Sequence, residues 1–319
     1  MSYGQCKKCS NTKVVNRRHS GEQLCPECFT KSLEKKIYKT ISKFKMLNRN
    51  DKIVIGLSGG KDSISLLYNL IRIQEKTYNS EPIVAVSIDE GIDNYRKQSI
   101  DSASKFCESN NIEHRIISFK ERIGYTLDEL IEKKKKESVK NRYACNYCAL
   151  MRRRLLNDEA RELGADVLAL GHNLTDIAET FLMNILFNRL KLIANQYIFK
   201  ELDTETNKFF IKKITPLMRI PEEEIFLYAN IKKFDYYPSH CPYRDLDPIL
   251  RKRVLEFIQI CKKYSPEIEF NLFKSFSELS EILYKNIISV RNKHCNVCGY
   301  PSAISDICNY CKFIKELKY

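Results

Sequence analysis

The chain has 319 residues, 43% of them hydrophobic, so it can bury one large core with appendages or two separate cores. Lys and Arg outnumber Asp and Glu by 54 to 40, which favours a polyanionic partner such as RNA or DNA, although a lysine-rich genome produces the same excess. No apolar stretch reaches the roughly 18 residues of a membrane-spanning helix, and no signal-peptide pattern precedes Cys6, so we expect a soluble cytoplasmic protein.

Cysteine pairs near both ends of the chain predict two small metal-binding modules. In a reducing compartment, clustered cysteines indicate metal or redox chemistry rather than structural disulfides. The N-terminal pairs are Cys6, Cys9, Cys25 and Cys28, and the C-terminal pairs are Cys295, Cys298, Cys308 and Cys311. Two C-x-x-C pairs suit a tetrahedral Zn²⁺ ion, and the same spacing also fits an iron–sulfur cluster. We expect zinc ribbons at 1–32 and 291–319 and a catalytic domain at 33–290.

Strand and helix patterns alternate between the two cysteine-rich ends. Patterns of buried strands lie at 52–57, 82–89, 112–119 and 166–172. Helical periodicity lies at 63–74, 94–109 and 173–186, and again later at 221–233 and 246–264. Such alternation predicts a parallel sheet with helices on both faces. The highly charged segment 125–144 is expected to be mobile, or helical when bound to a partner.

A short glycine-rich loop, "SGGKDS" at 58–63, follows the first predicted strand and opens the first helix. Gly59 and Gly60 let the backbone approach phosphate groups, and the helix N-terminus offers free amides and a positive dipole. Lys61 adds a charge, while Ser58 and Ser63 add hydroxyl groups. The long Gly-x-x-x-x-Gly-Lys-Ser/Thr spacing of the common NTPase loop is absent, so the loop predicts a different kind of nucleotide site.

This loop resembles the signature of the PP-loop ATP pyrophosphatases, which have the adenine nucleotide alpha hydrolase-like fold, a doubly wound parallel α/β sheet. In that superfamily the loop binds the pyrophosphate part of ATP, and Mg²⁺ bridges the phosphates. The resemblance implies a catalytic role for Lys61. It also implies that the nucleotide contacts come from Gly56, Ser58, Gly59, Gly60, Lys61, Asp62 and Ser63.

A second segment, "LGHNLTDIAET" at 170–180, resembles the Gly-His-Asn-x-x-Asp segment of the same superfamily. Gly171 would permit close approach, and Asp176 is a candidate for Mg²⁺ or nucleotide chemistry. An aspartate in the first turn of a helix also complements the helix dipole, which is an alternative explanation for Asp176. Because nucleotides bind at the carboxyl ends of the strands in such sheets, the adenosine is expected near Ile88 and Asp89.

Three further cysteines lie between the terminal modules. Cys145 and Cys148 open a predicted helix, and Cys241 stands in "HCPY". One C-x-x-C pair cannot close a tetrahedral site, but three cysteines on a [4Fe-4S] cluster would leave one iron open to a ligand such as hydrosulfide. A transient redox disulfide, a zinc site and plain burial are the alternatives. Cys107 and Cys261 are interpreted as structural.

The combination of terminal ribbons, "SGGKDS", "CNYC" and "HCPY" resembles the archaeal and eukaryotic cytoplasmic tRNA 2-thiouridine synthetase family over nearly the whole chain. The resemblance implies a [4Fe-4S] cluster on Cys145, Cys148 and Cys241 and two zinc ions on the terminal sets. It also implies that Arg152, four residues after Cys148, lies near the nucleotide. Some relatives have lysine there, and a solvated or RNA-facing arginine is the alternative.

The resemblance implies an ATP-dependent tRNA sulfurtransferase. ATP would adenylate O2 of a uridine, favoured at the wobble position over the T-loop, and sulfur would replace that oxygen with loss of AMP. The sulfur would come from sulfide or from a ubiquitin-like thiocarboxylated carrier protein, and a homodimer is usual among relatives. Arg152–Arg154 and Lys133–Lys136 would contact tRNA phosphates, although a lysine run fits a solvated face equally well.

Three other functions fit part of the sequence. A lysidine synthetase-like enzyme would need no central cysteine trio, and cytidine thiolation fits the centre of the chain but not its terminal modules. A non-catalytic zinc-ribbon RNA-binding scaffold fits the ends and the charge. The intact segments at 58–63 and 170–176 argue against a scaffold, because RNA binding alone requires no pyrophosphate loop.

Overall fold

The computed structural model describes residues 5–9, 11–12, 15–77, 80–136, 144–199, 208–246, 250–287, 293–302 and 305–318. Its N-terminal module is an antiparallel hairpin of β1 (Val15–Arg17) and β2 (Glu22–Leu24), followed by α1 (Pro26–Lys43). Cys25 is the N-cap of α1 and a proline follows it, which is a favourable start for a helix.

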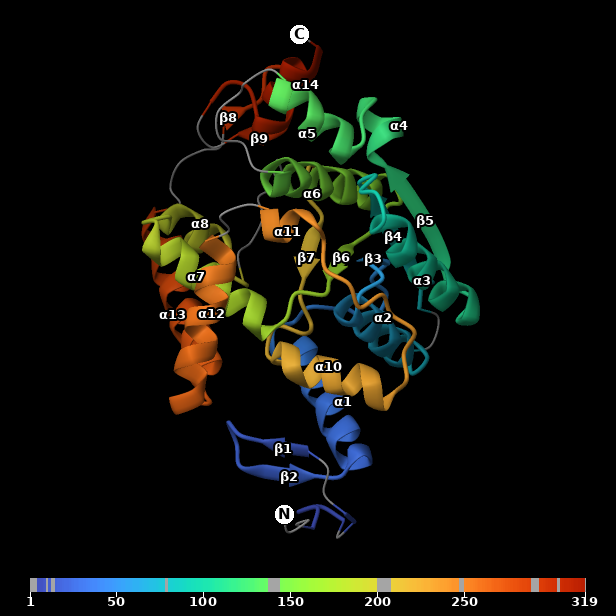
Figure 1. Ribbon diagram of the computed structural model, residues 1–319, viewed down its shortest axis with the longest axis vertical. Helices are drawn as coiled ribbons and strands as arrows, with labels where there is room; N and C mark the ends of the chain where they lie inside the picture. Colours follow the sequence, from blue (N-terminus) through green and yellow to red (C-terminus); the bar gives the residue numbers. More distant parts are fainter. Residues whose placement is uncertain are drawn as a thin grey trace.

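A five-stranded parallel sheet lies at the centre of the molecule (Figure 1). Its strands are β3 (Ile53–Gly56), β4 (Val84–Asp89), β5 (Glu113–Ser118), β6 (Val167–Leu170) and β7 (Lys212–Ile214). They lie in the order β5-β4-β3-β6-β7, and every neighbouring pair is parallel. The four strands predicted from the sequence are therefore confirmed. The fifth, β7, lies at the edge of the sheet and reads Lys-Lys-Ile, which carries no buried-strand pattern.

Helices cover both faces of the sheet, as the alternation of elements predicts. The helices of the sheet region are α2 (Lys61–Gln74), α3 (Arg96–Ser109), α4 (Phe119–Ile123), α5 (Leu127–Lys136) and α6 (Ala144–Glu162). Ile53 and Ile55 of β3 point to a core that contains side chains of α1 and α2, whereas Val54 points to a core that contains side chains of α5 and α6. This two-sided burial is expected when successive strand residues face opposite ways.

The second half of the chain adds a helical layer. Its helices are α7 (Leu174–Leu186), α8 (Leu190–Asn195), α10 (Glu222–Ile231), α11 (Tyr243–Leu246), α12 (Leu250–Tyr264) and α13 (Ile268–Ile287). Figure 1 shows α7, α8, α12 and α13 packed together beside the sheet. Helix α10 instead packs against α1 and α2. Of the charged segment 125–144, residues 127–136 form α5, and 137–143 lie outside the described residues.

The C-terminal module comprises β8 (Lys293–His294), β9 (Pro301–Ser302) and α14 (Asn309–Lys318), and it lies at the opposite end of the molecule from the N-terminal module (Figure 1). Phe313 and Leu317 of α14 enter the same core as α5 and α6. Among the helices that the structure describes, none combines the length and hydropathy needed to cross a membrane.

Arg154 fastens this module to α6. Its guanidinium carbon lies 3.6 Å from the ring centroid of Tyr300 and 4.8 Å from that of Tyr310, and Nη1 lies 3.7 Å from Cys298 Sγ. Arg154 also forms an ion pair with Asp158 on the next turn of α6, and the Tyr300 hydroxyl donates to that carboxylate at 2.8 Å. The C-terminal cysteine set is thus tied to the helix that begins with Cys145 and Cys148.

Replacing Arg154 should loosen this attachment. Arg154→Ala removes two ring contacts and a charged hydrogen bond, so we expect a loss of roughly 2 kcal/mol of unfolding free energy in urea denaturation. The exposed neighbour Arg153 provides the control, and Arg153→Ala should cost less than about 0.5 kcal/mol. Equal losses in the two variants would contradict this role of Arg154.

Candidate active site at the carboxyl edge of the sheet

The phosphate loop connects β3 to α2 and contains one backbone position that only glycine can occupy. Gly59 has φ +83°, and a Cβ atom there would lie 1.8 Å from the carbonyl oxygen of Ser99. Ser63 Oγ accepts the Ser58 N–H at 3.1 Å and lies 3.0 Å from Ser58 Oγ, which closes the loop onto the first turn of α2. Gly60 is the N-cap of α2 and provides no side-chain cap, so the helix presents uncapped amides, the groups that bind phosphate at a helix N-terminus.

Lys61 is paired with two carboxylates. Its Nζ lies 3.0 Å from Asp62 Oδ2 and 2.6 Å from Oε1 of Glu222, at the start of α10. Burial lowers the pKa of Lys61, but the two carboxylates outweigh it and hold the pKa above its ordinary value. Burial raises the pKa of Asp62, against the effect of Lys61. The lysine is therefore a cation held at the loop, and Glu222 is a partner that the sequence motifs did not indicate.

The second predicted segment lies against the phosphate loop. A Cβ on Gly171 would come within 3.2 Å of the Ser63 backbone nitrogen, so the two loops approach closely. Asn173 is the N-cap of α7 and donates through Nδ2 to Asp62 Oδ1 at 3.0 Å. This contact joins the two nucleotide-binding segments that the sequence predicts.

Asp176 closes a capping box at the start of α7. Its N–H donates to Asn173 Oδ1 at 3.0 Å, and its Oδ2 accepts the Asn173 N–H at 3.1 Å. Its Oδ1 lies 3.4 Å from Nη2 of Arg251. The capping contact uses only Oδ2. The alternative explanation from the sequence, an aspartate in the first turn of a helix, therefore accounts for one of the two carboxylate oxygens. The side chain as a whole is 34% exposed, and the role of Asp176 at Mg²⁺ stays a prediction.

The end of β4 lies next to the phosphate loop, where the adenosine was predicted. Ile88 is 2% exposed and its side chain belongs to the core, so only its backbone can reach a nucleotide. Its carbonyl accepts a hydrogen bond from Nε of Arg96 at 2.6 Å. Asp89 Oδ1 accepts the Gly91 N–H at 2.8 Å, which shapes the turn that follows the strand.

Cys145 and Cys148 lie one turn apart at the start of α6, and Cys241 lies just before α11. Cys145 is exposed, whereas Cys148 and Cys241 pack against the core of the α6 side. Burial raises the pKa of Cys148 to about 12, and the charges of Glu90, Cys241 and Cys145 act in the same direction while Arg152 opposes them. These three cysteines do not form one of the tight sulfur sets described next.

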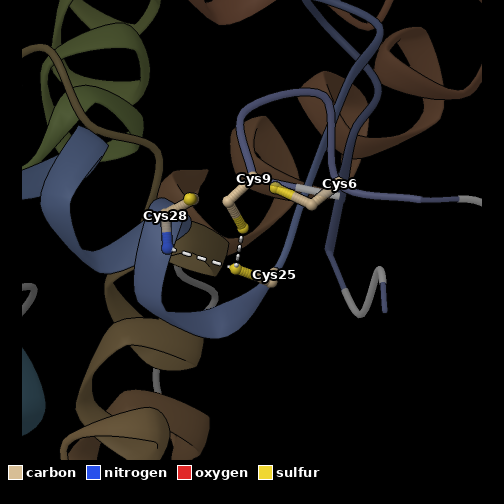
Figure 2. A group of neighbouring side chains, drawn as sticks. All are labelled: Cys6, Cys9, Cys25 and Cys28. Atoms are coloured by element: carbon tan, nitrogen blue, oxygen red, sulfur yellow. Dashed lines mark hydrogen bonds between the residues drawn. The ribbon is translucent and has the colours of Figure 1, made fainter. Parts of the chain in front are cut away.

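The terminal cysteines form two tight sulfur sets. In each set the four Sγ atoms lie within 4.8 Å of one another, and Figure 2 shows Cys6, Cys9, Cys25 and Cys28 converging. The C-terminal set is Cys295, Cys298, Cys308 and Cys311. Although burial opposes it, backbone N–H donors lower the pKa of Cys6 and of Cys295 to about 6. Four converging sulfurs with N–H donors fit one tetrahedral ion such as Zn²⁺. A four-iron cluster instead binds each cysteine through a different iron, which suits the looser central trio.

The match to known families agrees with this geometry. The sequence model of the PP-loop domain matches residues 29–254, so the fold and the phosphate loop define a PP-loop protein. The tRNA 2-thiolation protein NcsA of Haloferax volcanii is 32% identical over 98% of this chain and 99% of its own. A tRNA-5-methyluridine(54) 2-sulfurtransferase of Pyrococcus horikoshii is 31% identical over 97% of this chain and 93% of its own.

A solved structure matches as well. The U34-tRNA thiolase NcsA from Methanococcus maripaludis, determined with its [4Fe-4S] cluster, aligns with a TM-score of 0.82 and 32% identity over 99% of this chain and 97% of that one. The chain belongs to the tRNA 2-thiolation protein family of PP-loop proteins.

Gly59 offers a test of the phosphate loop. Gly59→Ala combines a left-handed backbone with a steric collision, so we expect it to lose roughly 3 kcal/mol of unfolding free energy, or to displace the loop and abolish ATP binding measured by calorimetry. Gly124 has a similar φ of +81° but open space around it, so Gly124→Ala isolates the backbone cost of about 1 kcal/mol and should leave ATP binding intact. A Gly59→Ala protein that matches Gly124→Ala in both measurements would exclude close packing of this loop.

Proposed function

We propose that the protein is an ATP-dependent tRNA sulfurtransferase that makes 2-thiouridine. The observation that carries the proposal is the placement of an uncapped phosphate loop and three cysteines at one edge of the sheet. The loop follows β3, and the Tyr237 N–H, four residues before Cys241, donates to the Gly59 carbonyl at 3.0 Å. Arg152, one turn after Cys148 on α6, lies 3.1 Å from Glu90, which directly follows the neighbouring strand β4. Relatives named for tRNA 2-thiolation and 2-sulfurtransfer support the substrate and the reaction.

Activation of the uridine is the task of the phosphate loop. Uridine O2 attacks the α-phosphate of ATP, the bond between the α- and β-phosphates breaks, and pyrophosphate leaves. Lys61 and the amides at the start of α2 stabilise the negative charge that develops on this leaving group. Mg²⁺ would be held by the phosphates and Asp176, and it would offset the same charge. The shorter loop therefore suits a reaction in which pyrophosphate departs rather than one in which the γ-phosphate is transferred.

Sulfur insertion is the task of the cysteine trio. Cys145, Cys148 and Cys241 fit a [4Fe-4S] cluster, which supplies an open iron for a sulfur ligand when bound. Hydrosulfide attacks C2 of the adenylated uridine and a C–S bond forms. The bond between C2 and the former O2 breaks, AMP leaves with that oxygen, and the proton of the hydrosulfide is lost. Sulfide or a thiocarboxylated carrier protein would donate the sulfur. The two zinc ions would stabilise the terminal modules, which bury little core of their own.

Only some of the basic side chains predicted to contact tRNA are free to do so. Arg154 is enclosed by the rings of the C-terminal module, and Lys133 donates to the Leu317 carbonyl at 2.9 Å. Phosphate contacts on α6 therefore fall to the exposed Arg153 and to the accessible part of Arg152. Modification of the wobble uridine is favoured, because the relative with the TM-score of 0.82 is a U34-tRNA thiolase. We place the enzyme in the cytoplasm, as a homodimer.

The cysteine trio predicts a specific pattern of iron loss. Purified without oxygen, the protein should contain about four irons and two zincs per chain. Cys241→Ser should lose the iron–sulfur absorbance and at least roughly 100-fold of thiolation activity, because it removes a thiolate ligand of the cluster directly. Cys261→Ser, at a cysteine of α12 outside all three sets, should keep both. Zinc without any iron–sulfur absorbance in the unaltered protein would overturn the cluster assignment.

The position of the modified uridine distinguishes the two branches of the proposal. A strain that lacks the gene should lose 2-thiouridine derivatives at the wobble position, as measured by mass spectrometry of tRNA fragments, and keep them in the T-loop. Loss at position 54 instead is the alternative that the Pyrococcus horikoshii relative supports. A strain with unchanged thiolation at both positions would refute the proposed function.

A further inference from the structure

A buried glutamate lies between the phosphate loop and the cysteine-bearing helix. Glu90 directly follows β4 and its side chain is 3% exposed, which is rare for a glutamate unless it is paired. It has two arginine partners. Glu90 Oε2 lies 2.7 Å from Nε of Arg96, and Oε1 lies 3.1 Å from Nε of Arg152. Neither Glu90 nor Arg96 belongs to a nucleotide or cysteine motif.

The first partner reaches the phosphate loop. Arg96 is the first residue of α3 and is 4% exposed. Its Nη1 donates to the carbonyl of Ser58 at 3.0 Å and to Ser99 Oγ at 3.0 Å. The Ser99 carbonyl is the group that leaves no room for a side chain at Gly59. Arg96 therefore ties the phosphate loop to the start of α3.

The second partner reaches the cysteine helix. Arg152 lies one turn after Cys148 on α6, and its side chain is 44% exposed. Arg152 and Cys148 therefore belong to the same helical segment. Glu90 thus pairs one oxygen with Arg96, which contacts the phosphate loop, and the other with Arg152, which belongs to the Cys148 helix.

We propose that Glu90 is a positioning residue that fixes the phosphate loop and the Cys148 helix relative to each other, so that the nucleotide and the cluster influence each other's binding. The proposal rests on the proposed function. A negatively charged carboxylate between two separate elements can hold both, because the buried Arg96 and the partly exposed Arg152 pair with the same anion. The consequence is reciprocal: whatever factor the cluster contributes to ATP affinity, ATP contributes to cluster affinity.

The test compares ATP dissociation constants with and without the cluster. In the unaltered protein we expect the cluster-loaded form to bind ATP at least about five-fold more tightly than the cluster-free form, as measured by anaerobic calorimetry. Glu90→Gln keeps the shape of the side chain and removes its charge. The ratio of the ATP dissociation constants of the cluster-free and cluster-loaded forms should then fall to about one. Glu90→Asp keeps the charge and shortens the side chain, so its ratio should lie between the two, and it serves as the second variant if Glu90→Gln does not fold.

Glu159 provides a matched control for general destabilisation. It is also buried, at 4% exposure, and also bridges two arginines, with Arg115 Nη1 at 3.3 Å and Arg122 Nη2 at 3.2 Å. It lies near the other end of α6, away from Cys148. Glu159→Gln should lose stability like Glu90→Gln but keep the ratio of the unaltered protein.

Two results would overturn the inference. One is a ratio of ATP dissociation constants, without and with the cluster, that is near one in the unaltered protein. The other is a ratio that both Glu90 variants leave unchanged. Either result leaves the proposed function intact, provided that the protein binds ATP and iron. If the unaltered protein binds neither ATP nor iron, the proposed function itself fails.

Discussion

The parallel pairing of β3 with β6 is the constraint on which the rest of the site depends. These strands are far apart in the sequence but adjacent in the sheet, with Ile53 opposite Val167 and Gly56 opposite Leu170. They therefore end at the same level. The chain turns in opposite directions on either side of this pair, toward β4 and β5 on one side and toward β7 on the other, which is the switch point where open α/β sheets bind ligands. The phosphate loop follows β3 and the Gly171 loop follows β6, so the two loops lie next to each other at this edge of the sheet.

The charges at this edge are paired in the free protein. Lys61 is held by Asp62 and Glu222, Arg251 by Asp176 and Glu179, and Arg96 and Arg152 by Glu90. Phosphate groups that bind here can replace some of these carboxylates as partners of cations that the fold already holds in place. Fixed charges of this kind stabilise a departing anion more than mobile solvent does. Carboxylates that belong to no sequence motif, such as Glu222 and Glu90, lie near the loop as partners of these cations.

Features that depend only on a short stretch of neighbouring residues could be predicted from the sequence. Alternating patterns predicted four of the five strands, and "SGGKDS" marked the loop because its glycines and lysine are local requirements. The C-x-x-C pairs predicted the two sulfur sets, since each pair lies on one turn. The roles of Glu90, Glu222 and Arg154 could not be predicted, because each depends on a partner brought near only by the fold. Strand β7 was missed for a similar reason: pairing with β6, rather than its own Lys-Lys-Ile sequence, makes it a strand.

The central claim is that the phosphate loop activates the oxygen that sulfur replaces. A tRNA carrying heavy oxygen at O2 of the target uridine tests it most directly. During thiolation, mass spectrometry of the released AMP should show the heavy oxygen in its phosphate group, because O2 attacks the α-phosphate and departs with it. Heavy oxygen found in water or inorganic phosphate, with unlabelled AMP, would contradict adenylation of the base and with it the assigned role of the loop.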